Sequence, residues 1–378
     1  MQIKYPILFI LVMALFFSCS FKRELPESFI ADIENTAKKF VPDKRTKVFQ
    51  INYEYGEEHN KWIIEGETTE EELLRAIDSI ANKYFDQDEV SLNMQLLPQS
   101  ALKDTIYGLV KVSVGNLKKH PKHSAELVDQ ALMGTTLKLL KRLSYWYMVQ
   151  TPTDYLGWIT VGTVEELTEN ELEEWLQAEK STLNVNFAQV FSAASTNSPV
   201  VCDAVLGCTF KKRERQGDWQ EVELPDGRVG FIKQELIGEP VEIDNSKYPS
   251  REAVIALAKN MMGIPYIWGG NSTKGFDCSG FTSTIFRSLG YLLPRDANMQ
   301  VELGLHVVPK DDYSNVLPGD MIFFGPENLI THVGICLGGS YFIHCSDDVH
   351  INSLDEQDEL YNQYRKRTYS KIKRIIID

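Results

Sequence analysis

The chain is poor in positive charge. Its 39 Lys and Arg residues stand against 53 Asp and Glu residues, which gives a formal net charge of −14. No local run of basic residues offsets this balance. Nucleic acids and anionic lipid surfaces recruit proteins through basic patches. The sequence therefore argues against either of them as the partner of this protein.

Metal-binding patterns are also missing. The chain has six cysteines and seven histidines, but no His-Glu-x-x-His sequence and no cysteines at the spacing of a zinc site. We therefore expect neither a metal ion nor another cofactor. Cys202 could bridge to Cys208, and Cys336 could bridge to Cys345. The sequence leaves both disulfides open.

A hydrophobic run long enough to span a membrane is absent as well. The apolar segment 7–17 follows Lys4 and ends before Ser18, whereas a spanning helix needs about 20 residues. This pattern predicts a signal peptide over 1–18. Residues 15–19 resemble a lipoprotein cleavage site, which implies a lipid on Cys19 and an exported protein anchored in the cell envelope, periplasmic or on the cell surface. Secretion with an unmodified Cys19 is the alternative.

The remaining length is too great for one hydrophobic core and predicts several domains. Residues 19–104 have helical spacing at 29–40 and 71–84, and alternating apolar residues from Phe49 to Tyr55 that return after a turn at Trp62 and Ile64. We expect a small α+β module here. It contains no cluster of catalytic residue types, so we expect a role in spacing or interaction.

Two later segments, 105–165 and 191–240, repeat one pattern of short strands with a Trp and a following Gly-aromatic pair. The repeat resembles a bacterial SH3-like barrel. In the first copy we expect strands at 108–114, 136–140, 145–150 and 155–160.

The segments between the domains read as linkers. In the linker 166–190, Thr168 and Glu171 form a capping box that predicts a short acidic helix. The polar segment 241–250 precedes the last domain, 251–378, whose first helix should begin near Arg251.

Cys278 lies where a nucleophilic thiol is expected. Apolar residues at Phe281, Ile285 and Leu289 have helical spacing, and Asp277 is a good N-cap. Cys278 is then in the first turn of a helix, where free N–H groups and the positive end of the helix dipole favour a thiolate. We expect a cysteine with a lowered pKa and an oxyanion donor at its own backbone N–H.

His332 and His344 complete the set of residues that nucleophilic catalysis by a thiol requires. Segments 332–337 and 341–344 predict two antiparallel strands joined at 338–340. A three-residue loop, or a bulge that restores its parity, places both histidines on one face, whereas a two-residue loop would separate them. We predict the first arrangement, with His332 as general base and His344 as the residue that orients it.

The sequences at 265–270, 277–280 and 332–335 resemble the NlpC-type family of bacterial cell-wall cysteine peptidases. The resemblance covers about 250–378 and implies a papain-like α+β domain. The complete prediction is a multidomain α+β protein with two SH3-like β-barrels, a small N-terminal module and this catalytic domain. Residues 294–300 are similar to the dipeptidyl-peptidase VI subgroup, which cleaves the γ-D-glutamyl–diamino acid bond of murein stem peptides that begin with a free L-alanine.

The same resemblance implies a set of substrate-binding residues. Glu126, Tyr155 and Asp296 would bind the substrate ammonium, as a partly buried cation requires. The other residues expected in the pocket are Tyr266, Asp277, Ser279 and, as a weaker candidate, Arg295. The partner would be a murein stem peptide, and we expect a monomer.

Two other functions remain open on the sequence. One is a different murein amidase or an acyltransferase that uses the same Cys278 and histidines. The other is a cell-wall-binding lipoprotein without catalysis. The sequence does not choose between lysine and diaminopimelate at the third stem position, nor between recycling, defence and scavenging.

Overall fold

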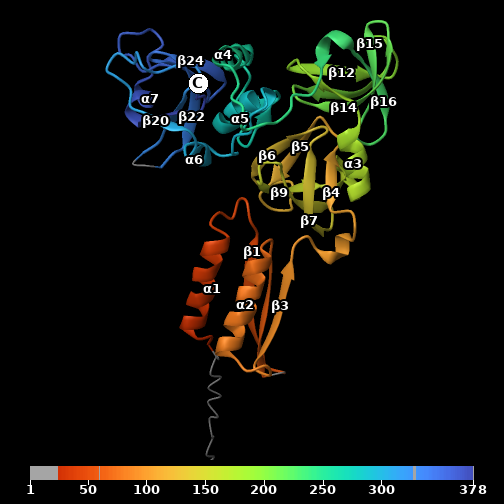
Figure 1. The fold of residues 1–378 in the computed structure, drawn as a ribbon, viewed down its shortest axis with the longest axis vertical. Helices are drawn as coiled ribbons and strands as arrows, with labels where there is room; N and C mark the ends of the chain where they lie inside the picture. Colours follow the sequence, from red (N-terminus) through yellow and green to blue (C-terminus); the bar gives the residue numbers. More distant parts are fainter. Residues whose placement is uncertain (1–23, 59, 327–328, 378) are drawn as a thin grey trace, which may run out of the picture.

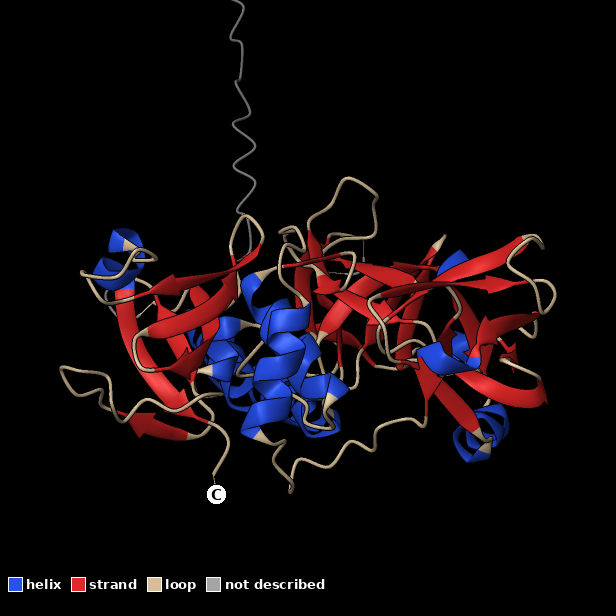
Figure 2. Ribbon diagram, turned by 90° about the horizontal axis from the view of Figure 1, so that it is seen from above, coloured by secondary structure: helices blue, strands red, loops and turns tan. Residues whose placement is uncertain are grey.

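The computed structural model describes residues 24–58, 60–326 and 329–377. Figure 1 shows the N-terminal module, the first barrel above it, and the second barrel and C-terminal domain to either side at the top. Seen from above, the C-terminal domain and the barrels occupy opposite ends of the molecule (Figure 2). The expected signal peptide and Cys19 lie outside the described residues. Within those residues, no helix has both the length and the apolar character needed to cross a bilayer.

The N-terminal module packs two helices on one side of a three-stranded sheet. Phe29 and Ile33 of the first helix and Leu73 and Ile77 of the second are fully buried with Ile64 of the sheet. The elements are α1 (Glu27–Phe40), β1 (Phe49–Gly56), β2 (Lys61–Thr68), α2 (Glu71–Tyr84) and β3 (Val90–Leu96).

Both predicted helices and the predicted hairpin of this module are confirmed. The parallel strand β3, which completes the sheet beside β2, was not predicted. Its alternating Val90, Leu92 and Met94 pack against the module's core and were an available signal.

The first barrel is a seven-stranded sheet in the order β10-β4-β7-β8-β9-β5-β6. Its core contains Leu117, Leu139, Tyr147 and Ile159, all fully buried. The strands are β4 (Tyr107–Val110), β5 (Val114–Lys118), β6 (Leu127–Leu132), β7 (Thr136–Leu143), β8 (Trp146–Gln150), β9 (Leu156–Thr160) and β10 (Val164–Leu167).

The prediction of one strand over 108–114 is wrong. The chain turns at 111–113, and β4 and β5 pair with different neighbours. The turn is held from outside the barrel, because Ser113 Oγ donates to the Asp203 carboxylate of the second barrel at 3.0 Å and accepts from Lys274 of the C-terminal domain at 2.8 Å. The sequence of 108–114 has the propensity of one continuous strand, and contacts of Ser113 with two other domains accompany its division into β4 and β5.

The second barrel repeats the seven-stranded arrangement, in the order β13-β12-β16-β15-β14-β11-β17. It begins at Lys180 and not near 191, because β11 pairs with β14. The strands are β11 (Lys180–Leu183), β12 (Phe187–Phe191), β13 (Val200–Val205), β14 (Thr209–Gln216), β15 (Trp219–Glu223), β16 (Val229–Lys233) and β17 (Ile237–Gly238).

The predicted acidic helix lies between the two barrels as α3 (Glu169–Gln177), and the capping box of Thr168 with Glu171 is present. The segment 166–190 contains both this helix and strand β11, which belongs to the second barrel. Only the part of the segment before β11 therefore connects the two barrels.

In the C-terminal domain a helix packs against a six-stranded antiparallel sheet in the order β20-β25-β21-β22-β23-β24. Phe281, Ile285 and Phe286 of helix α5 are fully buried against Val333 and Ile343 of the sheet. The elements are α4 (Arg251–Asn260), β18 (Asn271–Ser272), β19 (Gly275–Phe276), α5 (Cys278–Ser288), α6 (Ala297–Gln300), β20 (Leu305–Val307), β21 (Met321–Phe324), β22 (His332–Gly338), β23 (Tyr341–Cys345), β24 (Val349–Ser353), α7 (Gln363–Thr368) and β25 (Tyr369–Arg374).

The hairpin of β22 and β23 has the predicted parity through a bulge. Ile335 pairs with Ile343, and the register shifts between Cys336 and Gly338 before the turn. The described cysteines 202, 208, 278, 336 and 345 are all free thiols. The two disulfides that the sequence left undecided, Cys202–Cys208 and Cys336–Cys345, are therefore not formed. Cys336 and Cys345 belong to different hydrophobic cores.

Candidate active site

A cavity of about 820 Å³ lies where the N-terminal module, the first barrel and the C-terminal domain meet. It brings together residues from three domains, and most of the predicted site residues line it. These residues are Glu126, Tyr155, Tyr266, Asp277, Cys278, Ser279 and Asp296.

Cys278 is the first residue of helix α5. The Asp277 side chain caps the helix by accepting from the Gly280 N–H at 2.7 Å, as predicted. The backbone N–H groups of Val333 and Ser279 lie near the Cys278 sulfur and act to lower the pKa of the thiol. The thiol therefore lies near the start of β22, where Val333 directly follows His332.

The two histidines are directly connected. His332 Nε2 lies 2.8 Å from His344 Nδ1, and both side chains are buried. The chain of contacts continues, since His344 Nε2 lies 3.0 Å from Asn352 Oδ1 and Asn362 Nδ2 donates to the same oxygen at 2.8 Å. The Asn362 side-chain oxygen caps α7 by accepting from the Arg365 N–H at 3.0 Å.

This chain of contacts determines which ring nitrogens carry protons. The backbone N–H of Arg365 can only donate, so it fixes the amide of Asn362 and, through it, that of Asn352. Asn352 Oδ1 then accepts from His344 Nε2–H, and a neutral His344 accepts at Nδ1 from His332 Nε2–H. The lone pair of His332 is left on Nδ1, the nitrogen available to a thiol.

The expectation of a cysteine with a lowered pKa is wrong. Burial, with the nearby Asp277 charge, raises the pKa of the Cys278 thiol to about 12. Burial also lowers the pKa of His332 well below its ordinary value, and that of His344 to about 3. The resting groups are therefore a neutral thiol and a neutral imidazole, because enclosure outweighs the helix dipole.

The three residues expected to bind an ammonium group come from two domains. Tyr155 of the first barrel donates its hydroxyl to Asp296 Oδ2 of the C-terminal domain at 3.0 Å. Glu126 precedes β6, is exposed at the mouth of the cavity, and accepts from Trp268 Nε1 at 2.9 Å and from Lys119 at 3.1 Å. Those two donors, Lys119 first, lower the pKa of Glu126, although burial opposes the shift.

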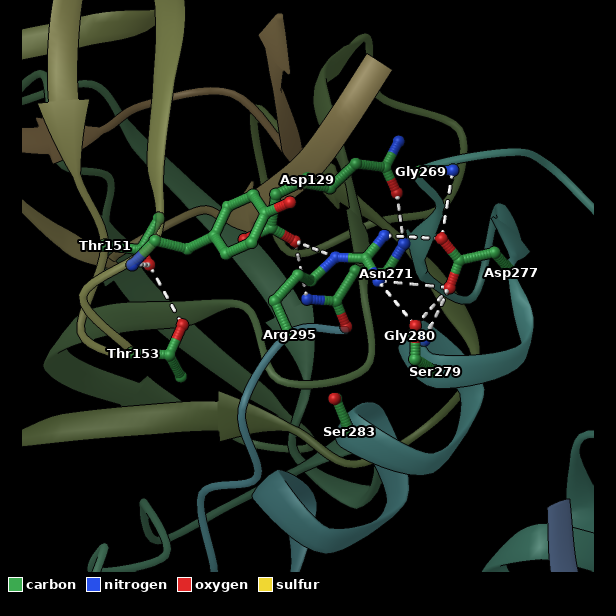
Figure 3. A network of polar contacts seen from close by, with 12 residues as sticks. Asp129, Thr151, Thr153, Gly269, Asn271, Asp277, Ser279, Gly280, Ser283 and Arg295 are labelled. Carbon is green, nitrogen blue, oxygen red and sulfur yellow. Dashed lines mark hydrogen bonds and ion pairs between the residues drawn. The ribbon is translucent and has the colours of Figure 1, made fainter. Parts of the chain in front are cut away.

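Arg295, like His332 and His344, is not among the residues that line the cavity, and its place in the substrate pocket stays a prediction. Its side chain is 2% exposed and is held at Asp129 of the first barrel (2.7 Å) and at Asp277 (2.6 Å), as Figure 3 shows. Asp277 also accepts from the N–H groups of Gly269 and Gly280. The Arg295 guanidinium and the Asp277 carboxylate are therefore both bonded to groups of the protein. Asp277 lines the cavity, but both of its carboxylate oxygens already accept hydrogen bonds.

Strand β6 holds the first barrel against the loop that precedes the nucleophile. Gln130 Oε1 accepts from the Asn271 N–H and from Ser272 Oγ, both at 2.9 Å. Gly269 has φ +74°, and a Cβ there would meet the Leu127 carbonyl oxygen at 2.3 Å. Only glycine allows this approach, which places Glu126 beside the segment 265–270 that precedes the nucleophile.

Sequence reasoning missed Asn352, Asn362 and Arg45. The two asparagines act through contacts between β24, α7 and the histidine hairpin, and neither belongs to a recognisable motif. Arg45 comes from the N-terminal module and donates to Asp296 at 2.6 Å. In the described part of the chain, no group of three or more His, Cys, Asp or Glu side chains is arranged to hold a metal.

Two segments match known protein families. Residues 263–374 match the NlpC/P60 family, and residues 117–162 match the bacterial dipeptidyl-peptidase Sh3 domain. The first match contains Cys278, His332 and His344, and the second contains Glu126 and Tyr155.

Individual proteins are similar to this chain over stretches of different length. Dipeptidyl-peptidase 6 of Lysinibacillus sphaericus is 28% identical over 274 residues, which cover 70% of this chain and 97% of that protein. The gamma-D-glutamyl-L-lysine dipeptidyl-peptidase of Bacillus subtilis (strain 168) is 44% identical over 117 residues, 30% of this chain and 37% of that protein. The crystal structure of an NlpC/P60 family protein from Bacillus cereus shares the fold, with a TM-score of 0.61 at 21% identity over 71% of this chain and 99% of that chain.

Proposed function

Because residues 263–374 form an NlpC/P60 domain behind a dipeptidyl-peptidase Sh3 domain, we propose that this chain is a cysteine endopeptidase that hydrolyses the γ-D-glutamyl–diamino acid bond of murein stem peptides with a free N-terminal L-alanine. The observation that carries the proposal is one cavity that contains both the Cys278 nucleophile and the anionic pair Glu126 and Asp296. Relatives named dipeptidyl-peptidase 6 and gamma-D-glutamyl-L-lysine dipeptidyl-peptidase support it.

Acylation begins from the neutral pair. His332 Nδ1 takes the thiol proton as Cys278 Sγ attacks the γ-carbonyl carbon, so the ion pair exists only while the new bond forms. The backbone N–H of Cys278 is in the first turn of α5, where helical N–H groups lack an intrahelical acceptor. It donates to the oxyanion. The carbon–nitrogen bond then breaks, and the imidazolium gives its proton to the departing amine.

Deacylation repeats the proton transfer with water. His332 Nδ1 takes a proton from a water molecule that attacks the thioester, the carbon–sulfur bond breaks, and the proton returns to sulfur. The products are L-Ala-γ-D-Glu and the diamino acid fragment. His344 stabilises the imidazolium in both steps by accepting from His332 Nε2–H.

Recognition of the free amine follows from charge. An ammonium nitrogen has three donors, and the carboxylates of Glu126 and Asp296 with the Tyr155 hydroxyl provide oxygen acceptors in the cavity. An acylated nitrogen has one donor and no charge. The predicted preference is therefore for peptides released from the glycan and not for intact murein.

The site of action is the cell envelope, as the NlpC/P60 family implies. Within it, the predicted signal peptide 1–18 and a lipid on Cys19 would hold the enzyme at a membrane as a monomer. Mass spectrometry of the N-terminal peptide from the native host tests this part, since a diacylglyceryl modification on Cys19 is expected and an unmodified mature N-terminus would contradict it.

The activity is tested with L-Ala-γ-D-Glu-L-Lys, its diaminopimelate counterpart and their N-acetylated forms, each incubated with the chain from residue 19 onward. Mass spectrometry should show much faster cleavage at the γ-D-glutamyl bond of the free-amine peptides than of their N-acetylated forms, and none by Cys278→Ala. Equal rates on both forms would retain the peptidase and reject the amine preference. Cleavage of neither would reject the proposed substrate.

A further inference from the structure

The N-terminal module, residues 24–104, lies outside both family matches, which begin at 117. Its loop between α1 and β1 nevertheless reaches the active-site cavity. The residues of this loop and of the start of β1 that line the cavity are Lys44, Arg45, Lys47, Val48, Phe49 and Gln50. We call 44–50 the end-wall segment.

The end-wall segment is fixed to the first barrel through its backbone. The Leu156 N–H donates to the Arg45 carbonyl oxygen at 2.7 Å, and Gln150 Nε2 donates to the Thr46 carbonyl oxygen at 2.9 Å. Leu156 follows Tyr155 directly. These bonds therefore hold Arg45 next to one of the three proposed ammonium ligands.

The Arg45 side chain then crosses to the C-terminal domain. Its Nη1 donates to Asp296 Oδ2 at 2.6 Å and to Asn298 Oδ1 at 2.8 Å, while Nη2 donates to Asp43 Oδ2 at 2.6 Å. The guanidinium is planar and forked, so it can hold two carboxylates in fixed positions at once. Arg45 thus joins the N-terminal module to the residue at the amine end of the cavity.

The charges of Asp43, Arg45 and Asp296 together favour the binding of a substrate cation. Asp43 balances Arg45, so the set of Asp43, Arg45 and Asp296 retains one net negative charge. Both bonds that Asp296 accepts from Arg45 and Tyr155 end on Oδ2. Among the described residues Oδ1 accepts no side-chain bond, so it can receive an ammonium.

We propose that Arg45 is a specificity-determining residue, and that the end-wall segment closes the cavity beyond the substrate's amino nitrogen. The inference rests on the proposed function. A nitrogen bound by Asp296 would lie next to the guanidinium, which bonds to the same carboxylate, and the end-wall segment lines the same cavity. An acyl group on that nitrogen has to enter the space that Arg45 occupies, whereas an ammonium ends before it.

The test compares the chain from residue 19 onward with Arg45→Ala and Arg45→Met. Arg45→Met keeps most of the side-chain volume near the backbone, and serves if the alanine variant folds poorly. Arg75→Ala is the matched control, because Arg75 is an exposed arginine of the same module, paired with Glu71 on helix α2 and outside the residues that line the cavity. For each protein, kcat/KM is measured on L-Ala-γ-D-Glu-L-Lys and on its N-acetylated form.

We expect Arg45→Ala to reduce the ratio of kcat/KM on the free-amine peptide to kcat/KM on the N-acetylated peptide at least tenfold, mainly because kcat/KM on the N-acetylated peptide rises. Arg45→Met should reduce this ratio less, and Arg75→Ala should not change it. An unchanged ratio in both Arg45 variants would overturn this inference alone. A gain confined to the free-amine peptide would also overturn it, since Arg45 would then merely compete with the substrate cation. If the parent chain cleaved neither peptide, the proposed function and this inference would fall together.

Discussion

His332 and His344 are joined by a 2.8 Å hydrogen bond between Nε2 of the first and Nδ1 of the second. Each ring therefore dictates the tautomer of the other. The direction of the bond is decided outside the pair, at Asn352 and finally at the N-cap of helix α7. The basic nitrogen of His332, the proposed catalytic histidine, thus depends on the backbone N–H of Arg365, four contacts away.

Asn352 is accordingly a positioning residue. In Asn352→Ala the acceptor for His344 Nε2–H is lost, so His344 can carry its proton on Nδ1 and force His332 to carry its own on Nδ1, which removes the lone pair proposed to take the thiol proton. We expect kcat to fall roughly 10- to 100-fold with little change in KM, part of what general acid–base catalysis supplies. Steady-state kinetics on the free-amine peptide measure both constants.

Asn352→Asp is the matched control, because it keeps the acceptor oxygen. It should retain kcat within a few-fold, and its carboxylate should raise the pKa of His344 and move the acid limb of the pH profile upward. A merely structural role would leave that limb in place. Equal losses of kcat in the alanine and aspartate variants, with no movement of the limb, would refute the tautomer argument.

Cys278→Ala should abolish turnover without unfolding the domain. The substitution removes one sulfur atom from a helix whose buried contacts are made by Phe281, Ile285 and Phe286, so the free energy of unfolding should change by no more than about 1 kcal/mol. Mass spectrometry of the products and urea denaturation measure the two effects. Any turnover by the folded variant would remove Cys278 from the mechanism.

The pH dependence should report a neutral resting pair. With the pKa of the Cys278 thiol raised to about 12, its alkylation by iodoacetamide should be slow at pH 7 and still rising at pH 10. Because the pKa of His332 is lowered, the acid limb of kcat/KM should lie below the ordinary histidine value of about 6.5. Peptide-level mass spectrometry separates Cys278 from the partly exposed Cys202. A plateau in alkylation from pH 5 to 8 would instead show a preformed thiolate.

The sequence predicted what depends on local order. A helix opened by Asp277 and a hairpin closed at Gly338 are short-range features, so spacing could place Cys278 in the first turn of a helix and His332 with His344 on one face of a sheet. Arg45 could not, because it meets Asp296 across 251 residues of sequence. The pKa of Cys278 was predicted in the wrong direction because a sequence shows the helix dipole but not the enclosure around the thiol.

The buried ion pair of Asp129 and Arg295 should matter for stability. Their side chains are 4% and 2% exposed, and Asp129 also accepts from Asn271 at 3.0 Å. Asp129→Asn leaves the Arg295 charge with one carboxylate in place of two, which should cost about 3 kcal/mol in the free energy of unfolding. Glu71→Gln, which breaks an exposed pair on α2, should have a much smaller effect, because solvent screens that pair. Urea denaturation compares them, and equal costs would contradict a structural role for the pair.

Glu126 allows the charge of the substrate amine to be tested by pH. Glu126→Gln keeps an acceptor for Trp268 Nε1 but removes the negative charge, so KM for the free-amine peptide should rise about tenfold, the loss of one charge-assisted hydrogen bond. KM for an N-acetylated peptide should not change, and Lys119→Ala, which frees Glu126 from its cation, should not raise KM for the free amine. An α-amino group has a pKa of about 8, so above that pH the parent chain should lose affinity and approach the variant. If the parent and Glu126→Gln differed by the same factor at pH 6.5 and pH 9.5, Glu126 would not be reading the ammonium charge.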